Sequence, residues 1–183
     1  EELPAQAVGM LGGLPTEDNA AEFYDLTEEI CVAAGMASYE VSNYARPGAE
    51  SRHNLIYWRY GDYAGIGPGA HGRLTLNESR LATDTLRQPN AWLEAVRKHG
   101  SGEVRREVLS LRDQRTEYVL MGMRLTEGVS VSRIVENGWK PLSESAVADL
   151  IELGMVNVQG DRIRATATGR KILNSVIARL LED

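Results

Sequence analysis

The sequence predicts an α+β protein that is built in two parts. Up to about residue 105, segments with helical periodicity alternate with short segments that have the apolar pattern of strands. After that point, several helical segments are followed by a hairpin and a last apolar helix. The chain has 183 residues, of which 43% are hydrophobic and 25% are charged, a composition typical of folded globular domains.

The first part, residues 1–105, opens on a helical signal at 16–35. Thr16 is a suitable N-cap, and Gly35 is a suitable C-terminal stop. Cys31 falls within this apolar pattern, so we expect it to be buried. An α-helix followed directly by a strand is typical of an α/β fold with parallel strands. The further elements predicted here are strands at 39–45, 71–76 and 79–86, a strand that runs into a Gly/Pro turn at 62–69, and a helix at 89–100.

The second part, residues 106–183, is predicted to be mostly helical and to follow the Ser-Gly step at 101 and 102. Helices are predicted at 110–125, near 130–136 and at 144–154, with a hairpin at 155–166. A final helix carries its apolar face on Ile172, Leu173, Val176, Ile177, Leu180 and Leu181. Helices, a hairpin and a further helix, in this order, are typical of a winged-helix-like domain.

The charge pattern argues against a nucleic-acid partner. The formal net charge is −6. The helix that would enter a DNA groove carries Glu144, Asp149 and Glu152, and no Lys or Arg occurs between 141 and 161. Phosphate binding needs positive charge, so we expect this domain to pack against or dock onto protein.

Cysteine usage limits the metal chemistry of the chain. A single cysteine forms no disulfide within the chain and holds neither zinc nor an iron–sulfur cluster. A reducing, cytoplasmic location fits this composition, and the acidic N-terminus lacks the pattern of a signal peptide. No run of about 18 apolar residues predicts a transmembrane segment. Homo-oligomerisation is compatible with the sequence.

The clearest functional signal is the segment at 53–73, HNLIYWRYGDYAGIGPGAHGR. Four of its large aromatic residues fall within seven positions: Tyr57, Trp58, Tyr60 and Tyr63. Haem needs only one axial histidine and otherwise apolar, aromatic surroundings, which makes His53 a candidate iron ligand with Tyr57 and Trp58 beside it. In the alternative interpretation, His53 and Asn54 bond backbone groups at a turn, and the aromatic side chains fill the core.

The second half of this segment, GIGPGAHG at 65–72, is rich in glycine. Glycines let a backbone approach a ligand closely and present N–H groups to anions. The loop matches neither a Walker A motif nor a dinucleotide-binding GxGxxG motif. Two interpretations stay open: ligand contact through Gly65, Gly67, Gly69 and His71, or a tight turn between strands.

Residues 39–74, with the element HNxxYW at 53–58, resemble the signature region of the oxygen-independent coproporphyrinogen III oxidase-like radical SAM proteins. Within that family, HNxxYW is similar to the haem chaperone branch. The segments at 12–30, 111–129 and 166–181 resemble further helices of the family. The resemblance implies that residues 1–105 are the last elements of a radical SAM partial α/β barrel with a β extension. Residues 106–183 would be the family's C-terminal winged-helix-like domain.

The resemblance also implies a function, as the C-terminal part of a chaperone that binds haem and delivers it to acceptor proteins. His53 would be an axial ligand of the haem iron, framed by Asn54, Tyr57 and Trp58, with the glycine-rich loop at the mouth of the barrel. S-adenosylmethionine and a 4Fe–4S cluster are implied for the full-length protein. The cluster cysteines are absent here, so we expect no enzymatic activity from this chain alone. The implied partners are haem or a porphyrin, an acceptor protein and the N-terminal half of the barrel.

Two other functions are compatible with the sequence. The chain resembles part of an oxygen-independent coproporphyrinogen III oxidase, which decarboxylates propionate side chains oxidatively in porphyrin biosynthesis. HNxxYW argues against that enzyme. The other alternative is a winged-helix interaction module.

Overall fold

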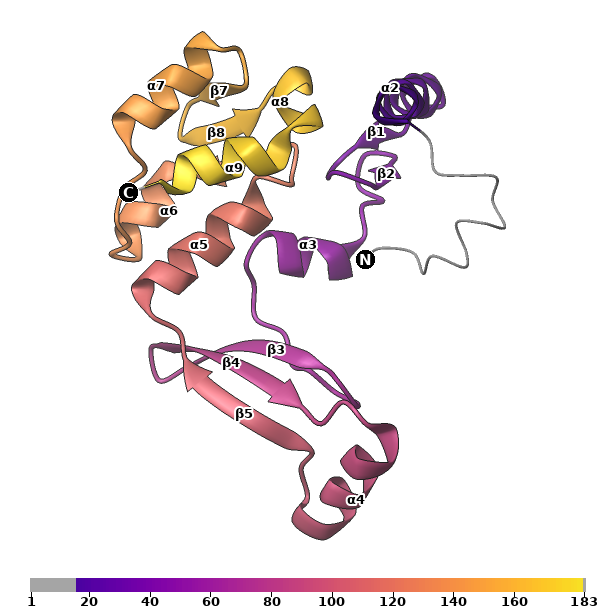
Figure 1. Cartoon of the computed structure of the whole chain (residues 1–183), viewed down its shortest axis with the longest axis vertical. Helices are drawn as coiled ribbons and strands as arrows, with labels where there is room; N and C mark the ends of the chain where they lie inside the picture. The colour runs from indigo at the N-terminus through magenta and orange to yellow at the C-terminus, as the bar shows by residue number, and fades with distance from the viewer. Residues whose placement is uncertain (1–15, 183) are drawn as a thin grey trace. The chain divides into compact units, whose positions relative to one another are not determined.

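The structure, a computed structural model, describes residues 16–182 (Figure 1). Helices and strands are mixed along the chain, which confirms the predicted α+β class. The chain divides into two compact units between Ala49 and Glu50. Residues 12–15 of the family-like segment at 12–30 lie outside the described residues. No helix among residues 16–182 is long and apolar enough to cross a membrane.

The first unit begins with the predicted helix, α2 (Glu17–Ala33). The helix starts here because the Thr16 hydroxyl accepts a hydrogen bond from the backbone N–H of Asn19 at 3.2 Å. It ends before Gly35, which has a φ of +73°. Cys31 is only half-buried, contrary to the prediction, because among the described residues of this unit only a small hairpin packs against the helix.

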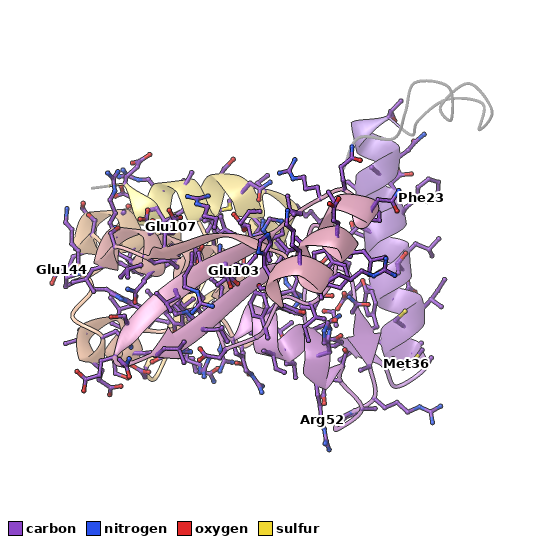
Figure 2. All side chains as sticks on the ribbon, turned by 90° about the horizontal axis from the view of Figure 1, so that it is seen from below. Phe23, Met36, Arg52, Glu103, Glu107 and Glu144 are labelled. Carbon is purple, nitrogen blue, oxygen red and sulfur yellow. The ribbon has the colours of Figure 1, made fainter. Side chains whose placement is uncertain are left out.

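The apolar face of α2 is exposed. Phe23, Leu26 and Ile30 lie at helical spacing and expose 58%, 51% and 59% of their surface. Figure 2 labels Phe23 on this helix. Apolar side chains at this spacing normally cover a protein core.

The prediction of a single strand at 39–45 is wrong. Two short strands, β1 (Ala37–Ser38) and β2 (Tyr44–Ala45), pair in an antiparallel hairpin instead. The chain turns between them because the side-chain amide of Asn43 donates a hydrogen bond to the buried Glu40 carboxylate. Helix α2 therefore leads into an antiparallel pair and not into the parallel arrangement that its sequence suggested.

The second unit opens with α3 (Arg52–Trp58), a helix of seven residues. Tyr60 follows it with a φ of +56°, although it is 94% buried, with only 6% of its surface exposed. A left-handed conformation is unfavourable for a side chain of this size, so the packing around Tyr60 must hold it there.

A three-stranded antiparallel sheet comes next, in the order β3-β4-β5 (Figure 1). Strands β3 (His71–Leu76) and β4 (Ser79–Thr85) confirm their predictions. Helix α4 (Pro89–His99) also confirms its prediction and joins β4 to β5 (Glu103–Val108). Strand β5 was not predicted. The domain division that we predict near residue 105 stays a prediction.

The strand predicted at the start of 62–69 is wrong as well, whereas the Gly/Pro turn predicted at its end is present. Its one pairing among the described residues is an isolated bridge between Tyr63 and Arg73. Gly67 and Gly69 have φ values of +108° and +69°. These values are incompatible with an extended strand, and the segment forms a loop.

A tight turn fixes the register of the β3–β4 hairpin. Asn77 and Glu78 are its two turn residues, and both have positive φ, 48° and 62°, as in the two-residue turns that match strand twist. The register places His71 directly opposite Asp84 at the far end of the hairpin.

The C-terminal elements confirm the predicted winged-helix order. Serine or threonine side chains cap four of the helices at their N-termini, including the predicted cap Ser110. The sheet of this domain has three strands in the order β6-β8-β7. The elements are α5 (Leu111–Gly122), β6 (Val129–Ser130), α6 (Val131–Glu136), α7 (Glu144–Glu152), β7 (Val156–Gln159), β8 (Arg162–Ala165), α8 (Ala167–Lys171) and α9 (Leu173–Leu181).

The final helix is divided in two, contrary to the prediction. The break lies at Ile172, whose φ and ψ of −123° and 35° are not helical and whose side chain is 49% exposed. Four other residues of the predicted apolar face are buried: Leu173, Val176, Ile177 and Leu180. Leu181 is half-buried. These side chains make α9 part of the core of the domain.

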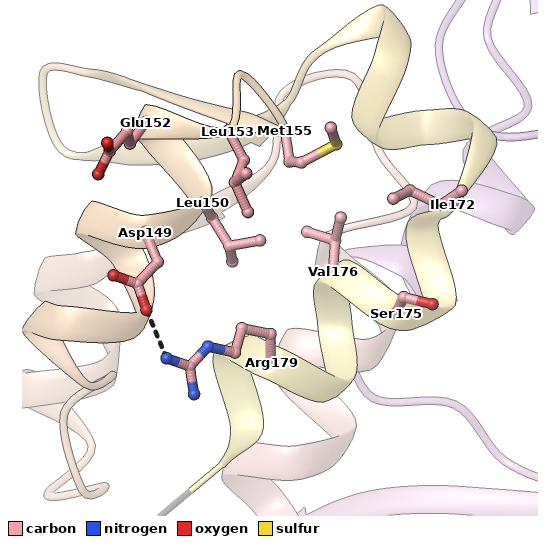
Figure 3. Close-up of a pocket in the computed structure, with 9 residues that line it drawn as sticks. All are labelled: Asp149, Leu150, Glu152, Leu153, Met155, Ile172, Ser175, Val176 and Arg179. Atoms are coloured by element: carbon pink, nitrogen blue, oxygen red, sulfur yellow. Dashed lines mark hydrogen bonds and ion pairs between the residues drawn. The ribbon is translucent and has the colours of Figure 1, made fainter.

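A groove of about 720 Å³ runs between α7 and α9 (Figure 3). Leu150, Leu153 and Val176 give it an apolar lining. At one end, Arg179 and Asp149 form an ion pair at 2.5 Å.

Candidate functional site

The four residues of HNxxYW lie together on α3. The helix begins after Ser51, whose hydroxyl accepts a hydrogen bond from the backbone N–H of Asn54 at 3.3 Å. His53 and Tyr57 are four residues apart and therefore share a face. The Tyr57 hydroxyl lies 3.0 Å from Nε2 of His53, and the ring centroids are 4.8 Å apart at an angle of 77°. His53 itself is exposed.

Tyr57 also joins the aromatic residues that follow α3. Its ring meets Tyr63 edge to face, with a centroid distance of 4.4 Å. Behind the two rings lies a cavity of about 200 Å³. Its lining consists of Tyr57, Tyr60, Tyr63, Arg73, Thr116, Glu117, Leu120 and Met121.

An ion pair closes one side of this cavity. The Arg73 guanidinium on β3 donates to the Glu117 carboxylate on α5, with Nη2 2.7 Å from Oε1 and Nε 3.0 Å from Oε2. The hydrogen bond to Glu117 raises the pKa of Arg73. The Tyr60 hydroxyl is buried beside the pair, and this burial raises its pKa.

Trp58 does not share this cavity. It lines a separate one of about 190 Å³, which lies toward Tyr118 and Glu127. Its indole Nε1 is buried and has no hydrogen-bond acceptor among residues 16–182. The structure thus brings His53 and Tyr57 into contact and turns Trp58 toward the winged-helix-like domain.

Sequence reasoning missed Arg80, which supports the turn after α3. Its side chain is buried and stands over the ring of Tyr60, with Cζ 4.3 Å from the ring centroid. It also donates to the backbone carbonyl of Gly61 at 2.8 Å and pairs with the Asp62 carboxylate. The signal in the sequence was weak, because one arginine on a strand of mixed polarity usually faces solvent.

Another ion pair connects the end of α3 to the loop before β6. Arg59 binds Glu127 through two hydrogen bonds, from Nε at 3.0 Å and from Nη2 at 2.8 Å. The Arg59 guanidinium lowers the pKa of the Glu127 carboxyl, with a smaller contribution from Arg162.

The pair makes stability depend on pH. Because the folded-state pKa of Glu127 lies below its ordinary value of 4.5, the stabilisation is present above that value and is lost as the pH falls through the folded pKa. We expect Glu127→Gln to lower the free energy of unfolding by about 0.5–1 kcal/mol at pH 7, as for partly exposed pairs, and to have little effect near pH 3. Urea unfolding at both pH values measures this, with the exposed Glu94→Gln as control. An equal loss at both pH values would contradict the assignment.

The glycine-rich loop is tied to strand β4. The Thr85 hydroxyl donates to the carbonyl of Gly67 at 2.5 Å and accepts from the N–H of Ala70 at 2.8 Å. The N–H of Gly69 donates to the Leu86 carbonyl at 2.8 Å. The N–H groups of Gly69 and Ala70 are therefore already bonded within the protein, and ligand contact through this loop stays a prediction.

Close backbone packing explains another glycine of the loop. A Cβ atom at Gly65 would lie 2.5 Å from the carbonyl oxygen of His71, which is closer than van der Waals contact allows. Only glycine fits here. In contrast, Ile66 beside it exposes 86% of its surface.

His71 lies at the start of β3 and is hydrogen-bonded to Asp84. Its Nδ1 is 2.6 Å from Oδ1 of Asp84, and Arg105 on β5 lies 3.6 Å from the other carboxylate oxygen. The hydrogen bond with His71 lowers the pKa of Asp84, and Arg105 adds to the effect.

The dimensions of the site limit how it would hold haem. The cavity behind Tyr57 has about 200 Å³, less than the roughly 300–1,000 Å³ of pockets that bury small-molecule ligands. A macrocycle does not fit inside it. The exposed imidazole of His53 and the adjoining Tyr57 ring fit one open wall of a haem site. Among residues 16–182, no group of three or more His, Cys, Asp or Glu side chains is placed to hold a metal ion.

Comparisons with known proteins cover nearly the whole chain. The family model described as the HemN C-terminal domain matches residues 109–172. Heme chaperone HemW of Mycobacterium tuberculosis (strain ATCC 25618 / H37Rv) is 35% identical over 91% of this chain and 40% of that protein. The mitochondrial radical S-adenosyl methionine domain-containing protein 1 of Bos taurus is 34% identical over 93% of this chain and 41% of that protein. The chain thus spans about two fifths of the length of these curated relatives.

A solved structure has the same fold. Coproporphyrinogen III oxidase (HemN) from Escherichia coli, described as a radical SAM enzyme, superposes with a TM-score of 0.67 over 92% of this chain and 42% of that one. The two sequences are 18% identical, so this likeness shows the fold alone. By sequence, the heme chaperone HemW of Escherichia coli is 30% identical over 93% of this chain.

Proposed function

Because this chain belongs to the HemW-like group of the oxygen-independent coproporphyrinogen III oxidase-like family, we propose that it is the C-terminal part of a haem chaperone. In this proposal the chain binds haem and the complete protein delivers it to acceptor proteins. The observation that carries the proposal is the exposed imidazole of His53 beside Tyr57 on α3. It stands in the element HNxxYW of a chain whose curated relatives are named heme chaperones.

The proposed role of His53 is to supply an axial nitrogen to the haem iron. When bound, haem contributes an iron that takes a neutral imidazole as its ligand. Nε2 of His53 lies 3.0 Å from the Tyr57 hydroxyl, so ligation through that atom requires Tyr57 to release it. Asn54 and Tyr57 would frame the macrocycle. Trp58, which faces another cavity, would support the helix from behind.

Two further cofactors belong to the proposal for the full-length protein only. S-adenosylmethionine and a 4Fe–4S cluster are expected in a radical SAM protein. This chain has one cysteine, whereas such a cluster is held by three or four thiolates. The described residues therefore contribute no cluster site of their own. A cytoplasmic location is part of the same proposal.

Titration with ferric haem tests the role of His53. We expect the intact chain to give a saturable shift of the Soret band, and His53→Ala to raise the Kd for haem at least about tenfold, the size expected for loss of a ligating group. Tyr57→Phe keeps the ring and frees Nε2, so its Kd should be no higher than that of the wild type. His99→Ala, on α4, is the matched control. Equal Kd values for wild type and His53→Ala would contradict the assignment.

Coproporphyrinogen III oxidase activity is the alternative function. This alternative is compatible with the fold that the chain shares with HemN. The corresponding full-length protein would then convert coproporphyrinogen III into protoporphyrinogen in the presence of S-adenosylmethionine and a reductant. We expect no such product, because the curated matches over nine tenths of this chain include heme chaperones at 30–35% identity.

A further inference from the structure

Arg133, on α6 of the winged-helix-like domain, binds the backbone at the end of α3. Its Nη1 donates a hydrogen bond to the carbonyl of Arg59 at 2.8 Å, and its Nη2 lies 3.4 Å from the carbonyl oxygen of Tyr60. Arg59 is the C-cap of α3, the helix that carries HNxxYW. A cation that donates to the last carbonyls of a helix stabilises that end of it, because the charge complements the helix dipole.

Helix α3 needs partners outside itself because it has only seven residues. Helices shorter than about 12–15 residues are marginally stable in water on their own. The carbonyls of Leu55, Ile56 and Tyr57 accept hydrogen bonds of 2.8–2.9 Å from the N–H groups that follow the helix. The turn itself is then held by side chains. Arg80 reaches the Tyr60 carbonyl at 3.3 Å, whereas the shorter bond to the preceding carbonyl comes from Arg133.

The guanidinium of Arg133 is itself fixed by the core of the winged-helix-like domain. Its Cζ lies 4.9 Å from the centroid of the Tyr118 ring, a cation–π contact. Tyr118 is 4% exposed, and its hydroxyl accepts a hydrogen bond from the backbone N–H of Ser130 at 2.9 Å. The backbone N–H of Arg133 donates to the Ser130 hydroxyl at 3.1 Å. Both the backbone and the side chain of Arg133 are therefore held in place.

The relation between His53 and Tyr57 depends on the helix that Arg133 supports. The imidazole and the Tyr57 ring form the proposed open wall of the haem site, and they lie one helical turn apart on α3. Their relative placement exists only while the backbone between them is helical. Fraying of α3 from its C-terminal end starts at the carbonyls that Arg133 binds, and it displaces the Tyr57 ring before it reaches His53.

We propose that Arg133 is a positioning residue for the haem site, which it serves by fixing the C-terminal end of α3. This inference rests on the proposed haem-binding function. Arg133 does not contact the haem itself; it acts through His53 and the ring beside it. The winged-helix-like domain thereby takes part in haem binding from a distance. The ion pair of Arg59 with Glu127 joins the same two segments through side chains, whereas Arg133 holds the backbone.

Ferric haem titrations of Arg133→Ala test the inference in two backgrounds, the wild type and His53→Ala. We expect the substitution to raise the Kd about five- to tenfold in the wild type, within the range of couplings between interacting residues. In the His53→Ala background we expect a change of less than about twofold, because the group that Arg133 positions is gone. Arg133→Lys keeps the charge with a single point of contact, so it should recover part of the affinity. Exposed Glu136→Ala, on the same helix, is the matched control.

The titrations separate the inference from the proposed function. Circular dichroism confirms that each variant is folded. A wild-type Kd in folded Arg133→Ala would overturn the inference and leave the proposed function standing. An equal rise of the Kd in both backgrounds would overturn it as well, because Arg133 would then not act through His53. A wild-type chain without saturable haem binding would overturn both the proposed function and this inference.

A second measurement needs no haem. Amide hydrogen exchange of the free chain reports how often α3 opens. In Arg133→Ala we expect faster exchange of the amides at 55–61, partial recovery in Arg133→Lys, and unchanged exchange in α7 and α9. Wild-type exchange at 55–61 in Arg133→Ala would overturn the inference, whatever the haem titrations give.

Discussion

Gly128→Ala is expected to unfold the winged-helix-like domain, whereas Gly138→Ala is expected to leave it folded. Both glycines have the same left-handed backbone, with φ values of +65° and +66°. At Gly138 a Cβ atom would meet nothing within 4 Å. At Gly128 it would lie 2.0 Å from the carbonyl oxygen of Ile163 on β8. The comparison separates the cost of the backbone conformation from the cost of the collision.

The steric collision at Gly128 lies in the core of the domain. Gly128 precedes β6, and Val129 pairs with Ile163 in the sheet. Val129 and Ile163 are almost completely buried, so β6 cannot move away from β8 without opening the core. We expect Gly138→Ala to cost about 1–2 kcal/mol for the left-handed alanine and Gly128→Ala to cost more than about 4 kcal/mol, which marks an exceptional substitution.

Urea unfolding followed by circular dichroism measures both variants. The two substitutions could lower the free energy of unfolding by amounts that differ by less than about 1 kcal/mol, which is smaller than the cost of a steric collision. That result would show that the sheet relaxes around the added methyl group. It would also mean that the close approach of β6 and β8 is not needed for the fold.

Arg80→Ala is expected to have the second largest effect. The Arg80 side chain is 93% buried, with 7% of its surface exposed, and three kinds of partner depend on it. The Asp62 carboxylate pairs with it, the Gly61 carbonyl accepts from it at 2.8 Å, and the Tyr60 ring lies 4.3 Å away. Because 44% of the Asp62 side chain is exposed to water, we expect the substitution to cost about 2–3 kcal/mol, mainly from the buried backbone carbonyl that loses its donor.

The loss should also reach the candidate site. Tyr60 and Gly61 form the turn after α3, and Tyr60 keeps an unfavourable positive φ. Without Arg80, we expect faster amide hydrogen exchange in this turn and in α3. Arg80→Lys keeps the charge but offers a single point of contact, so it should recover only part of the loss. The control is the exposed Arg97→Ala, for which the change should stay within about 1 kcal/mol. Unchanged exchange in Arg80→Ala would contradict the role of Arg80 as the support of this turn.

Elements with local signals were predictable from the sequence. Helix α5 begins at its predicted cap because the Ser110 hydroxyl accepts from the N–H of Asp113 at 3.1 Å and donates to its carboxylate at 2.7 Å. Helix α4 ends at Gly100 in a left-handed conformation. Such caps and stops need only neighbouring residues, so sequence reasoning finds them.

Elements that depend on distant partners were not predictable. Strand β5 has the sequence EVRREV, which lacks a regular apolar alternation because four of its six residues are charged. Ion pairs within and across strands take the place of an apolar face: Arg106 binds Glu103 at 2.8 Å, and Arg105 binds Glu107. Figure 2 labels Glu103 and Glu107 on this strand. Only the pairing with β4 makes this segment a strand.

The candidate site divides in the same way. The contact between His53 and Tyr57 follows from their spacing of four on a helix and was open to sequence reasoning. The ion pair of Arg73 with Glu117 joins residues 44 positions apart, so no local sequence pattern predicts it. The partner of His71 was missed for the same reason, because Asp84 lies across a hairpin.

The two-residue turn at Asn77 and Glu78 fixes the contact between His71 and Asp84 at the other end of the hairpin. Side chains alternate between the two faces of a strand, so an insertion of one residue in this turn would slip the ladder by one position. His71 and Asp84 would then project from opposite faces of the sheet, although neither had been changed. The hydrogen bond of the His71 imidazole therefore depends on the length of a turn that lies six residues along the chain and does not contact it. Changing the length of the turn is therefore expected to break the contact between His71 and Asp84 without substituting either residue.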